Sequence, residues 1–216
     1  MPVTVLKDQD VASYGDGMVL VSREGAVATL MLNRPSHRNA LSREMLIALT
    51  GAIEDLRREL EVSVVVLSGS GSSFCAGVDI SAEGRRQFYL PPQQIERLYQ
   101  ENGQNVVRAL QWLPQVTIAR VNGPAVGWGA CLATCCDFRV VADSAFFRIP
   151  EIGFGMYYDV GCLYGLLALV GPAQARRMTM LGDGIGAVEA ARIGLADRLA
   201  SVAQLADATD GVVRSL

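Results

Sequence analysis

The sequence predicts an α/β fold, and three observations support that prediction. Short apolar runs, typical of buried strands, alternate with longer segments in which apolar residues recur at helical spacing. Loops rich in glycine and polar residues separate these segments. Half of the 216 residues are hydrophobic, which is enough for a substantial core. Because strands and helices alternate along the chain, we expect parallel strand pairing with helices packed outside the sheet.

The first third of the chain predicts a hairpin, a helix and a buried strand. Residues 17–22 and 26–32 have the pattern of two hairpin strands. Ser42 is a suitable N-cap, because apolar residues recur after it at three- and four-residue spacing as far as Leu60. Residues 64–67 are a short apolar run between polar residues and glycine, which indicates a buried strand.

The rest of the chain repeats this pattern with variation. The segments expected here are helices at 93–113, 127–134, 161–169, 172–181 and 187–193, and strands at 116–121 and 139–142. Residues 83–92 fit no element well, and we expect them to form a loop over a pocket.

Charge and hydropathy exclude several classes of partner. The formal net charge is −3 and the isoelectric point is about 5.2, which argues against nucleic acid, since nucleic-acid-binding proteins usually carry a basic face. No apolar run reaches the roughly 18–20 residues of a membrane helix. The start of the chain lacks the pattern of a signal peptide. We therefore expect a cytoplasmic protein without a membrane partner.

The cysteines are expected to be reduced and to hold no metal. Their number is odd, they lie in apolar surroundings, and a chain with a single histidine is a poor candidate for a zinc site. The five are Cys75, Cys131, Cys135, Cys136 and Cys162.

Three segments differ from ordinary core sequence. Residues 74–79 follow a predicted strand, and their small residues let a ligand approach the backbone closely. Residues 122–130 also follow a strand, and they lead into a predicted helix whose first N–H groups have no acceptor within the helix. Two such N–H groups aimed at one point form an oxyanion hole for a thioester enolate. Glu151 follows a proline in apolar company, where partial burial raises a carboxyl pKa toward values useful for proton transfer.

Taken in order, these segments resemble the crotonase (enoyl-CoA hydratase/isomerase) superfamily. The resemblance runs from about residue 17 to about residue 200. The matching motifs are Leu32-Asn33-Arg34-Pro35, Asn39-Ala40-Leu41-Ser42, Phe74-Cys75-Ala76-Gly77-Val78-Asp79, Asn122-Gly123-Pro124-Ala125-Val126-Gly127, Cys136-Asp137-Phe138-Arg139, Pro150-Glu151, and Gly182 with Glu189-Ala190.

The resemblance implies a crotonase-like spiral of repeated ββα units as a core domain over residues 1–200. A short C-terminal helix at 201–216 follows, where family members usually continue into several helices. The resemblance also implies an acyl-thioester substrate whose coenzyme A or phosphopantetheine belongs to the substrate, with no separate cofactor. It further implies a homo-oligomer, either a trimer or a hexamer.

The resemblance also implies a set of site residues. The oxyanion amides would be the N–H groups of Val78 and Trp128, with Glu151 as the acid/base. Trp128 stands where the family usually has glycine, so we expect its indole to form a pocket wall. Further residues expected to contact the substrate are Ala76 near adenine, Arg38 at a phosphate, Tyr157 in the acyl pocket, and Gly77, Asp79, Gly127 and Cys131.

Cys131 stands where hydratases have a second glutamate. A hydratase uses two carboxylates to activate one water, whereas an isomerase needs one base and an oxyanion hole. We therefore expect double-bond isomerisation, with hydration, decarboxylation or hydrolysis as alternatives. Cys131 itself is expected to be a small filler rather than a nucleophile or an acid, because nothing near it in sequence lowers a thiol pKa.

The roles of several residues near these motifs stay open. Asp159 could supply the missing carboxylate or could be the N-cap of a helix. Tyr157 and Tyr158 could line the acyl pocket, donate a hydrogen bond or only pack. Ser36 and Ser81 stand where hydratases often have lysine, so a substrate on a carrier protein is open beside free coenzyme A.

A non-catalytic crotonase-like subunit is the alternative from another class. The loss at Cys131 and the short C-terminal region favour it, whereas Glu151 and the two glycine-rich loops favour an enzyme. In an enzyme, the Glu151 carboxylate should face the gap between the N–H groups of Val78 and Trp128.

Overall fold

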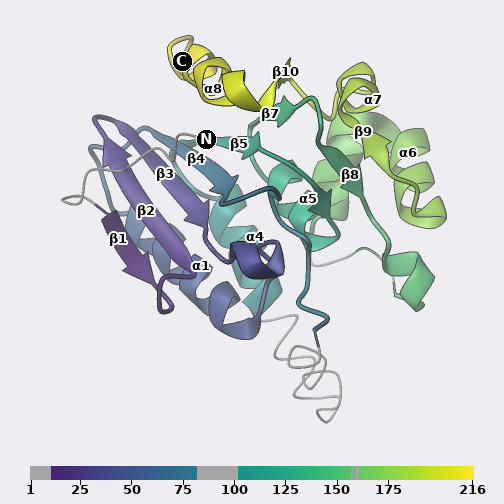
Figure 1. The fold of residues 1–216 in the computed structure, drawn as a ribbon, viewed down its shortest axis with the longest axis horizontal. Coiled ribbons are helices and arrows are strands. Elements are labelled where there is room, and N and C mark those ends of the chain that lie inside the picture. Colours follow the sequence, from purple (N-terminus) through teal and green to yellow (C-terminus); the bar gives the residue numbers. More distant parts are fainter. Residues whose placement is uncertain (1–10, 82–101, 157, 159–160) are drawn as a thin grey trace.

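A sheet of seven strands forms the centre of the molecule (Figure 1). The computed structural model describes residues 11–81, 102–156, 158 and 161–216. In spatial order the strands are β1 (Val11–Tyr14), β2 (Val19–Glu24), β3 (Val27–Leu32), β4 (Val64–Gly69), β5 (Val116–Val121), β7 (Phe138–Ala142) and β10 (Arg198–Ala200). The first three are antiparallel, and from β3 onward each neighbouring pair is parallel. The predicted α/β fold with parallel pairing is confirmed.

A smaller sheet contains β6 (Ala125–Val126), β8 (Phe146–Arg148) and β9 (Ile185–Gly186). Strand β8 pairs in parallel with β6 and antiparallel with β9. The chain passes from β5 in the large sheet to β6 in the small one, and later from β7 to β8, with α5 (Trp128–Thr134) between the two passages. This repetition of two strands and a helix is the expected spiral of ββα units.

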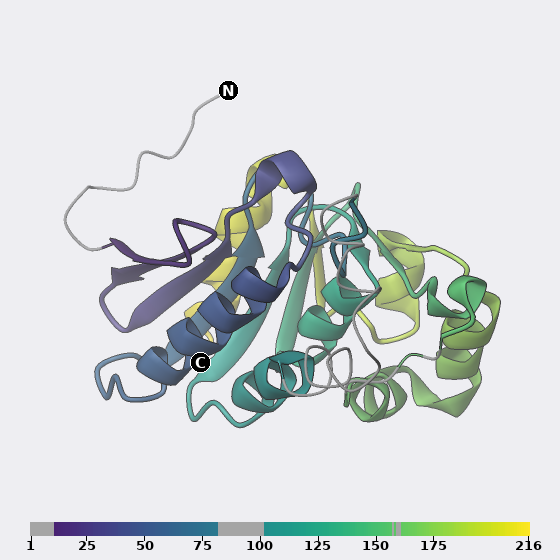
Figure 2. The same ribbon diagram turned by 90° about the horizontal axis from the view of Figure 1, so that it is seen from below.

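Helices cover both faces of the large sheet. On one face lie α1 (Arg43–Leu56), α4 (Asn102–Gln111) and α5, while α8 (Leu205–Val213) packs against β5, β7 and β10 (Figure 2). Helices α6 (Leu163–Leu181) and α7 (Ala187–Arg192) lie at the end that carries the small sheet (Figure 1). In the described part of the chain, short 3-10 helices are η1 (Pro35–His37), η4 (Glu151–Phe154) and η5 (Val202–Gln204). Of the helices described, none has the length and apolar character needed to cross a membrane.

Local sequence explains the best-predicted elements. Ser42 caps α1 as expected, because its Oγ accepts a hydrogen bond from the N–H of Met45 at 3.3 Å. The helix then buries a regular stripe that includes Leu49 and Ile53. All six residues of β4 are buried, as is typical of a central parallel strand that is covered on both faces.

Some elements differ from the prediction. Strands β8 and β10 have only three residues each, too few for a recognisable alternation. The helices predicted at 161–169 and 172–181 form one element, α6, kinked at Gly171, which has φ +72°. The loop predicted at 83–92 lies outside the described residues, and the helix predicted at 93–113 is described from Asn102 as α4.

Candidate active site

Successive turns of the spiral meet at one edge of the molecule. Parallel bridges join Leu41 to Val78 and Cys75 to Ala125, and β6 pairs in parallel with β8. Parallel segments end at the same edge, so the loops that follow them open toward the same place. This edge brings together the two glycine-rich loops and the Pro150-Glu151 segment.

Gly77 lets the two glycine-rich loops touch. Its φ is +87°, a conformation that favours glycine. A Cβ at this position would lie 2.7 Å from the carbonyl oxygen of Val126 and 3.5 Å from the nitrogen of Trp128. The absence of a side chain therefore lets the backbone at residues 77 and 78 pack against the start of α5.

The Val78 amide has the geometry of an available donor. In its bridge, the Leu41 N–H donates to the oxygen of Gly77 at 2.7 Å, and the Leu41 oxygen accepts from the N–H of Asp79 at 3.1 Å. The Val78 N–H therefore points away from Leu41, and it donates to none of the residues that the structure describes. Trp128 is the first residue of α5, where a helix supplies no acceptor for the N–H. The pairing of these two amides as an oxyanion hole stays a prediction.

Glu151 lies against Gly127. The N–H of Gly127 donates to the oxygen of Arg148 at 2.8 Å, which holds the end of β6 beside the end of β8. A Cβ at Gly127 would lie 2.6 Å from Oε1 of Glu151, and Gly127 has φ +53°. The backbone conformation, with ψ −117°, is one that favours glycine, and a side chain here would displace the carboxyl of Glu151. The carboxylate thus faces the loop that carries the Trp128 nitrogen.

The surroundings of Glu151 favour its neutral form. Its Oε2 is buried and has no hydrogen-bond partner among the described residues. Burial raises the pKa of this carboxyl above its ordinary value, and a hydrogen bond to its own backbone offsets this in part. A carboxyl whose pKa is moved toward neutrality is suited to accept a proton and to return it.

The indole of Trp128 packs against α4. A Cβ at Gly103 would overlap the six-membered ring of the indole. The same indole and Cys131 line a cavity of about 10 Å³ with apolar residues that include Val107. This cavity is far smaller than the roughly 300 Å³ of a typical ligand pocket, so the role of the indole as a wall of the substrate pocket stays a prediction.

Cys131 and Cys162 are both buried, and the structure places their sulfur atoms in direct contact, with Cα atoms 5.3 Å apart. The prediction that the cysteines are reduced, and that Cys131 is a small filler, stays a prediction. Cys75 and Cys135 stay as buried free thiols, and burial raises the pKa of each to about 12.

The sulfur atoms of Cys131, Cys135 and Cys162 lie within 4.8 Å of one another. Such a group has the composition of a soft-metal site. The prediction that the cysteines hold no metal stays a prediction.

Arg38 and Asp79 differ in what they can offer a substrate. The Arg38 oxygen accepts from the N–H of Ala76 at 3.0 Å, while its exposed side chain has no ion pair in the described part of the chain. Asp79 instead binds Nη1 of Arg34 at 2.7 Å. Burial pushes the pKa of Asp79 up, but hydrogen bonds from Ser81 and Arg34 hold it below its usual value. Asp79 therefore braces the loop, and its contact with substrate stays a prediction.

Asn39 organises the first loop, a role that sequence reasoning missed. Its Nδ2 donates to the carbonyl oxygens of Ser70 and Ser73, each at 2.9 Å, and of Phe74 at 3.2 Å. Its Oδ1 accepts from the N–H of Arg34 at 2.8 Å, and the side chain is fully buried. The available signal was the occurrence of Asn39 within one of the matching motifs.

Tyr158 is a second residue to which the sequence assigned no definite role. Its hydroxyl is buried without a partner among the described residues. Burial raises its pKa well above the ordinary value, and the nearby Cys135 and Glu151 add to this. Asp159 and Tyr157 lie outside the described residues, so the roles suggested for them stay predictions.

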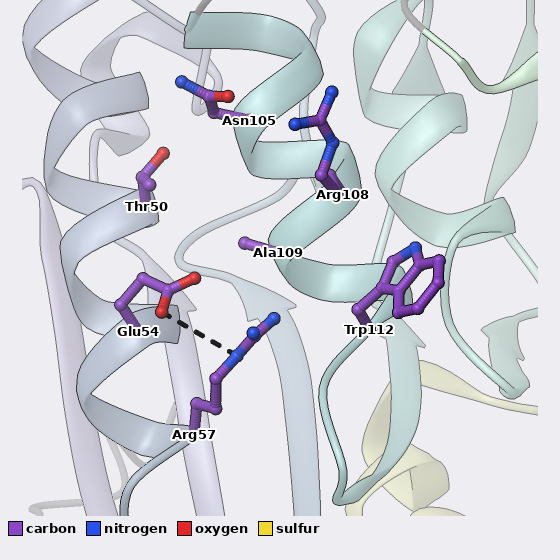
Figure 3. Close-up of a pocket in the computed structure, with 7 residues that line it drawn as sticks. All are labelled: Thr50, Glu54, Arg57, Asn105, Arg108, Ala109 and Trp112. Atoms are coloured by element: carbon purple, nitrogen blue, oxygen red, sulfur yellow. Dashed lines mark ion pairs between the residues drawn. The ribbon is translucent and has the colours of Figure 1, made fainter.

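A larger cavity of about 440 Å³ lies elsewhere, between α1 and α4 (Figure 3). It contains the ion pair of Arg57 Nε with Glu54 Oε2 at 3.7 Å, and its far side is formed by Arg108 and Trp112. None of the predicted site residues that the structure describes lines it. The volume of a cavity therefore does not identify the candidate active site in this chain.

Comparison with known proteins gives a consistent result. Residues 22–216 match the family model for enoyl-CoA hydratase/isomerase. The chain is 35% identical over 189 residues to a crotonyl-CoA hydratase of Syntrophomonas wolfei, covering 87% of this chain and 70% of that protein. It is 31% identical over 185 residues to a peroxisomal Delta(3,5)-Delta(2,4)-dienoyl-CoA isomerase of Arabidopsis thaliana. That match covers 82% of this chain and 66% of the isomerase.

A solved structure shows the same fold. It is described as an enoyl-CoA hydratase of Thermobifida fusca in complex with CoA, and it matches with a TM-score of 0.82 and 29% identity over 92% of this chain and 77% of that one. The fold and the site define a crotonase-type protein. The chain belongs to the enoyl-CoA hydratase/isomerase family of acyl-CoA enzymes.

Proposed function

We propose that this enzyme isomerises a carbon–carbon double bond in an acyl thioester. The N–H groups of Val78 and Trp128 hold the thioester oxygen and stabilise the enolate. Glu151 removes a proton from one carbon and returns it to another, which moves the double bond. The observation that carries this proposal is the Glu151 carboxyl, which lies beside the loop that holds the Trp128 nitrogen and has a buried oxygen without a partner among the described residues.

The residue at position 131 supports isomerisation over hydration. Hydration calls for a second carboxylate to help activate water, and the matching position here is Cys131, which carries no carboxylate. Isomerisation needs no second acid, since one carboxyl shuttles the proton. The dienoyl-CoA isomerase among the relatives is consistent with this choice.

Hydration is the second candidate, because other relatives carry that name. Both the crotonyl-CoA hydratase and a short-chain-enoyl-CoA hydratase of Clostridium acetobutylicum are 35% identical to this chain. The two reactions differ in mass balance. Hydration adds one water to the substrate, whereas isomerisation leaves its mass unchanged.

The substrate in this proposal is an acyl-CoA, or the same acyl group on the phosphopantetheine of a carrier protein. The backbone of Arg38 is hydrogen-bonded to Ala76 and its side chain is exposed, so its guanidinium is available to a phosphate in either case. The chemistry uses only protein groups and the substrate, so the proposal includes no separate cofactor. The proposal also holds that copies of this chain assemble into a homo-oligomer.

A panel of acyl-CoAs tests the proposal. The protein is incubated in deuterated water with 2-enoyl and 3-enoyl thioesters of several chain lengths, and the products are analysed by mass spectrometry and chromatography. We expect an isomeric product that carries deuterium and has gained no water. A product that has gained water would establish hydration instead. Measurable binding without deuterium uptake from any substrate would refute catalysis on free coenzyme A esters.

A further inference from the structure

The cavity of about 440 Å³ between α1 and α4 takes no part in the proposed reaction (Figure 3). Its volume falls within the range of roughly 300–1,000 Å³ that is usual for small-molecule sites. Residues of both helices line it, and none of the predicted site residues that the structure describes is among them. The cavity is therefore a candidate for a second binding site.

Helical spacing places the lining side chains on two facing stripes. On the α1 side, Thr50, Glu54 and Arg57 are four and three residues apart. On the α4 side, Ala109 and Trp112 are three residues apart. The two helices pack against each other, and Ala109 is 5% exposed. Its small side chain leaves room between the longer side chains of the two stripes (Figure 3).

The lining has an excess of positive charge, because it contains two guanidinium groups and one carboxylate. The Arg57 guanidinium extends from the end of α1 toward α4 (Figure 3). Its Nε lies 3.7 Å from Oε2 of Glu54, which is too long for a hydrogen bond, and it is buried without a hydrogen-bond partner among the described residues. The Arg108 side chain is exposed and has no ion pair in the described part of the chain. Both guanidinium groups therefore have hydrogen-bonding capacity that the protein does not use.

Trp112 adds a large flat surface to these polar groups. It is 74% exposed, although the burial of an aromatic ring is strongly favourable. The side-chain amide of Asn105 has no hydrogen bond with any residue that the structure describes, so it is available to a polar atom of a ligand. The cavity thus combines cationic donors with an exposed aromatic face.

We propose that the cavity between α1 and α4 binds a small aromatic oxyanion, a flat ring that bears a carboxylate or a phosphate. Arg57 and Arg108 bind the oxyanion, because guanidinium groups form strong, charge-assisted hydrogen bonds with carboxylates and phosphates. The ring of the ligand packs on the indole of Trp112. This site is separate from the candidate active site and does not depend on the proposed function.

The first test compares ligands that carry both features with ligands that carry one. Isothermal titration calorimetry measures the binding of 2-naphthoate and 2-naphthyl phosphate, of the neutral 2-naphthamide, and of acetate and inorganic phosphate. We expect at least one of the two aromatic anions to bind with a Kd of about 1 mM or below, the affinity that ligand efficiency allows for a molecule of this size. The amide and the two anions without a ring should bind about tenfold more weakly or worse.

The order of the two aromatic anions identifies the oxyanion. Tighter binding of 2-naphthoate assigns the site to carboxylates, and tighter binding of 2-naphthyl phosphate assigns it to phosphates. Either order supports the proposal. Binding of 2-naphthamide as tight as that of both anions would overturn it, because the guanidinium groups would then have no role.

The second test places the ligand in this cavity. Arg108→Ala should weaken the binding of the aromatic anion by about ten- to a hundredfold, since it removes charge-assisted hydrogen bonds. Trp112→Ala should weaken it by about two- to tenfold, since it removes the aromatic contact. Both side chains are exposed, so both variants should fold, as circular dichroism checks.

Arg58→Ala is the matched control. It removes an arginine that follows α1, lies outside the lining and pairs with Asp55 at 3.1 Å, so it should leave the affinity unchanged. Wild-type affinity in both Arg108→Ala and Trp112→Ala would place any binding elsewhere on the protein and would overturn the proposal. Absence of saturable binding of either aromatic anion to the wild-type protein would overturn it as well.

Discussion

At the scale of residues, the site depends on a carboxyl that the fold buries without complete hydrogen bonding. Oε2 of Glu151 has no partner among the described residues, and burial raises the pKa of the group. Such a group costs stability when it is charged, and that cost is characteristic of catalytic carboxyls. Gly127 is its structural counterpart, since any side chain there would meet Oε1.

The raised pKa predicts a pH-dependent effect of Glu151→Gln on stability. A raised folded-state pKa means that the folded protein holds the proton more tightly than the unfolded chain does. The ionised carboxyl therefore destabilises the fold above the folded-state pKa, and this penalty vanishes below the unfolded value. Glu151→Gln should melt at a higher temperature than wild type at pH 7.5 and at the same temperature near pH 4, as measured by calorimetry. A lower melting temperature at pH 7.5 would contradict the burial argument.

Gly127→Ala should reduce turnover by about a hundredfold or more, because even a 1 Å shift of a catalytic group has this effect. The new Cβ would lie 2.6 Å from Oε1 of Glu151, so the carboxyl must move. Gly186→Ala is the matched control, because a Cβ there meets nothing within 4 Å. Steady-state kinetics of both variants check the prediction. Equal kcat values for the two would show that the contact is unimportant.

Sequence reasoning reached part of this site. The two glycine-rich loops could be singled out from the sequence, because their backbone conformations restrict the residue types locally, whereas Glu151 could be singled out only together with the resemblance to a known family. The proximity of Cys131 and Cys162 was not predictable, because the cysteines are 31 residues apart and meet only through the packing of α5 and α6. The role of Asn39 could not be predicted for the same reason, since the carbonyl oxygens that it binds lie on a loop more than 30 residues further along the chain.

At the scale of elements, α4 and α5 meet through one large and one small residue. The indole of Trp128 occupies the space that a side chain at Gly103 would fill. This contact sets how closely α4 approaches the segment that carries the Trp128 nitrogen. Glycine within a helix costs helix propensity, so its presence at residue 103 is explained by packing.

Gly103→Ala should therefore destabilise the protein, by about 1–3 kcal/mol, even though alanine favours helix. Trp128→Leu should relieve the overlap, because leucine lacks the six-membered ring that the new Cβ would meet. Urea unfolding of both single variants and the double variant gives the coupling energy. Gly103→Ala should cost much less in the Trp128→Leu background than in wild type. Additive effects would contradict the packing argument.

The elements themselves were predictable in proportion to their length. Helix α1 and strand β5 are long enough to show their periodicity, and β5 has the predicted bounds. The short strands β6 and β9 have two residues each, and only tertiary pairing defines them. Local pattern carries no information about such strands.

At the scale of the whole molecule, the last strand of the large sheet is fastened by a buried ion pair. Arg139 in β7 is 2% exposed, and its Nη2 lies 2.6 Å from Oδ2 of Asp197, the residue before β10. The same carboxylate oxygen accepts from the N–H of Arg139 at 2.7 Å. The pair thus joins the C-terminal strand to the core.

Asp197→Ala should lower the free energy of unfolding by about 2–4 kcal/mol, because it leaves a buried guanidinium without its counter-charge. Glu189→Ala is the control, since it removes an exposed partner of Arg192 on α7 and should leave stability unchanged. Urea unfolding followed by circular dichroism measures both. Equal stability of the Asp197 variant and wild type would show that the pair does not fasten β10.

The overall spiral could be predicted only through the resemblance to a known family. Alternation of strands and helices predicts parallel pairing, but it does not predict that each turn adds a short strand to a second sheet. That arrangement depends on contacts such as the bridge of Cys75 with Ala125, between residues far apart in sequence.

The central claim is that Glu151 is the base of an enolate-forming enzyme, and deuterium exchange tests it most directly. Wild type and Glu151→Gln are each incubated with the preferred enoyl-CoA in deuterated water, and binding is measured in parallel. We expect Glu151→Gln to bind with nearly unchanged affinity and to lose about 10²–10⁴-fold in the rate of deuterium uptake. A folded Glu151→Gln protein that exchanges deuterium at the wild-type rate would contradict this claim.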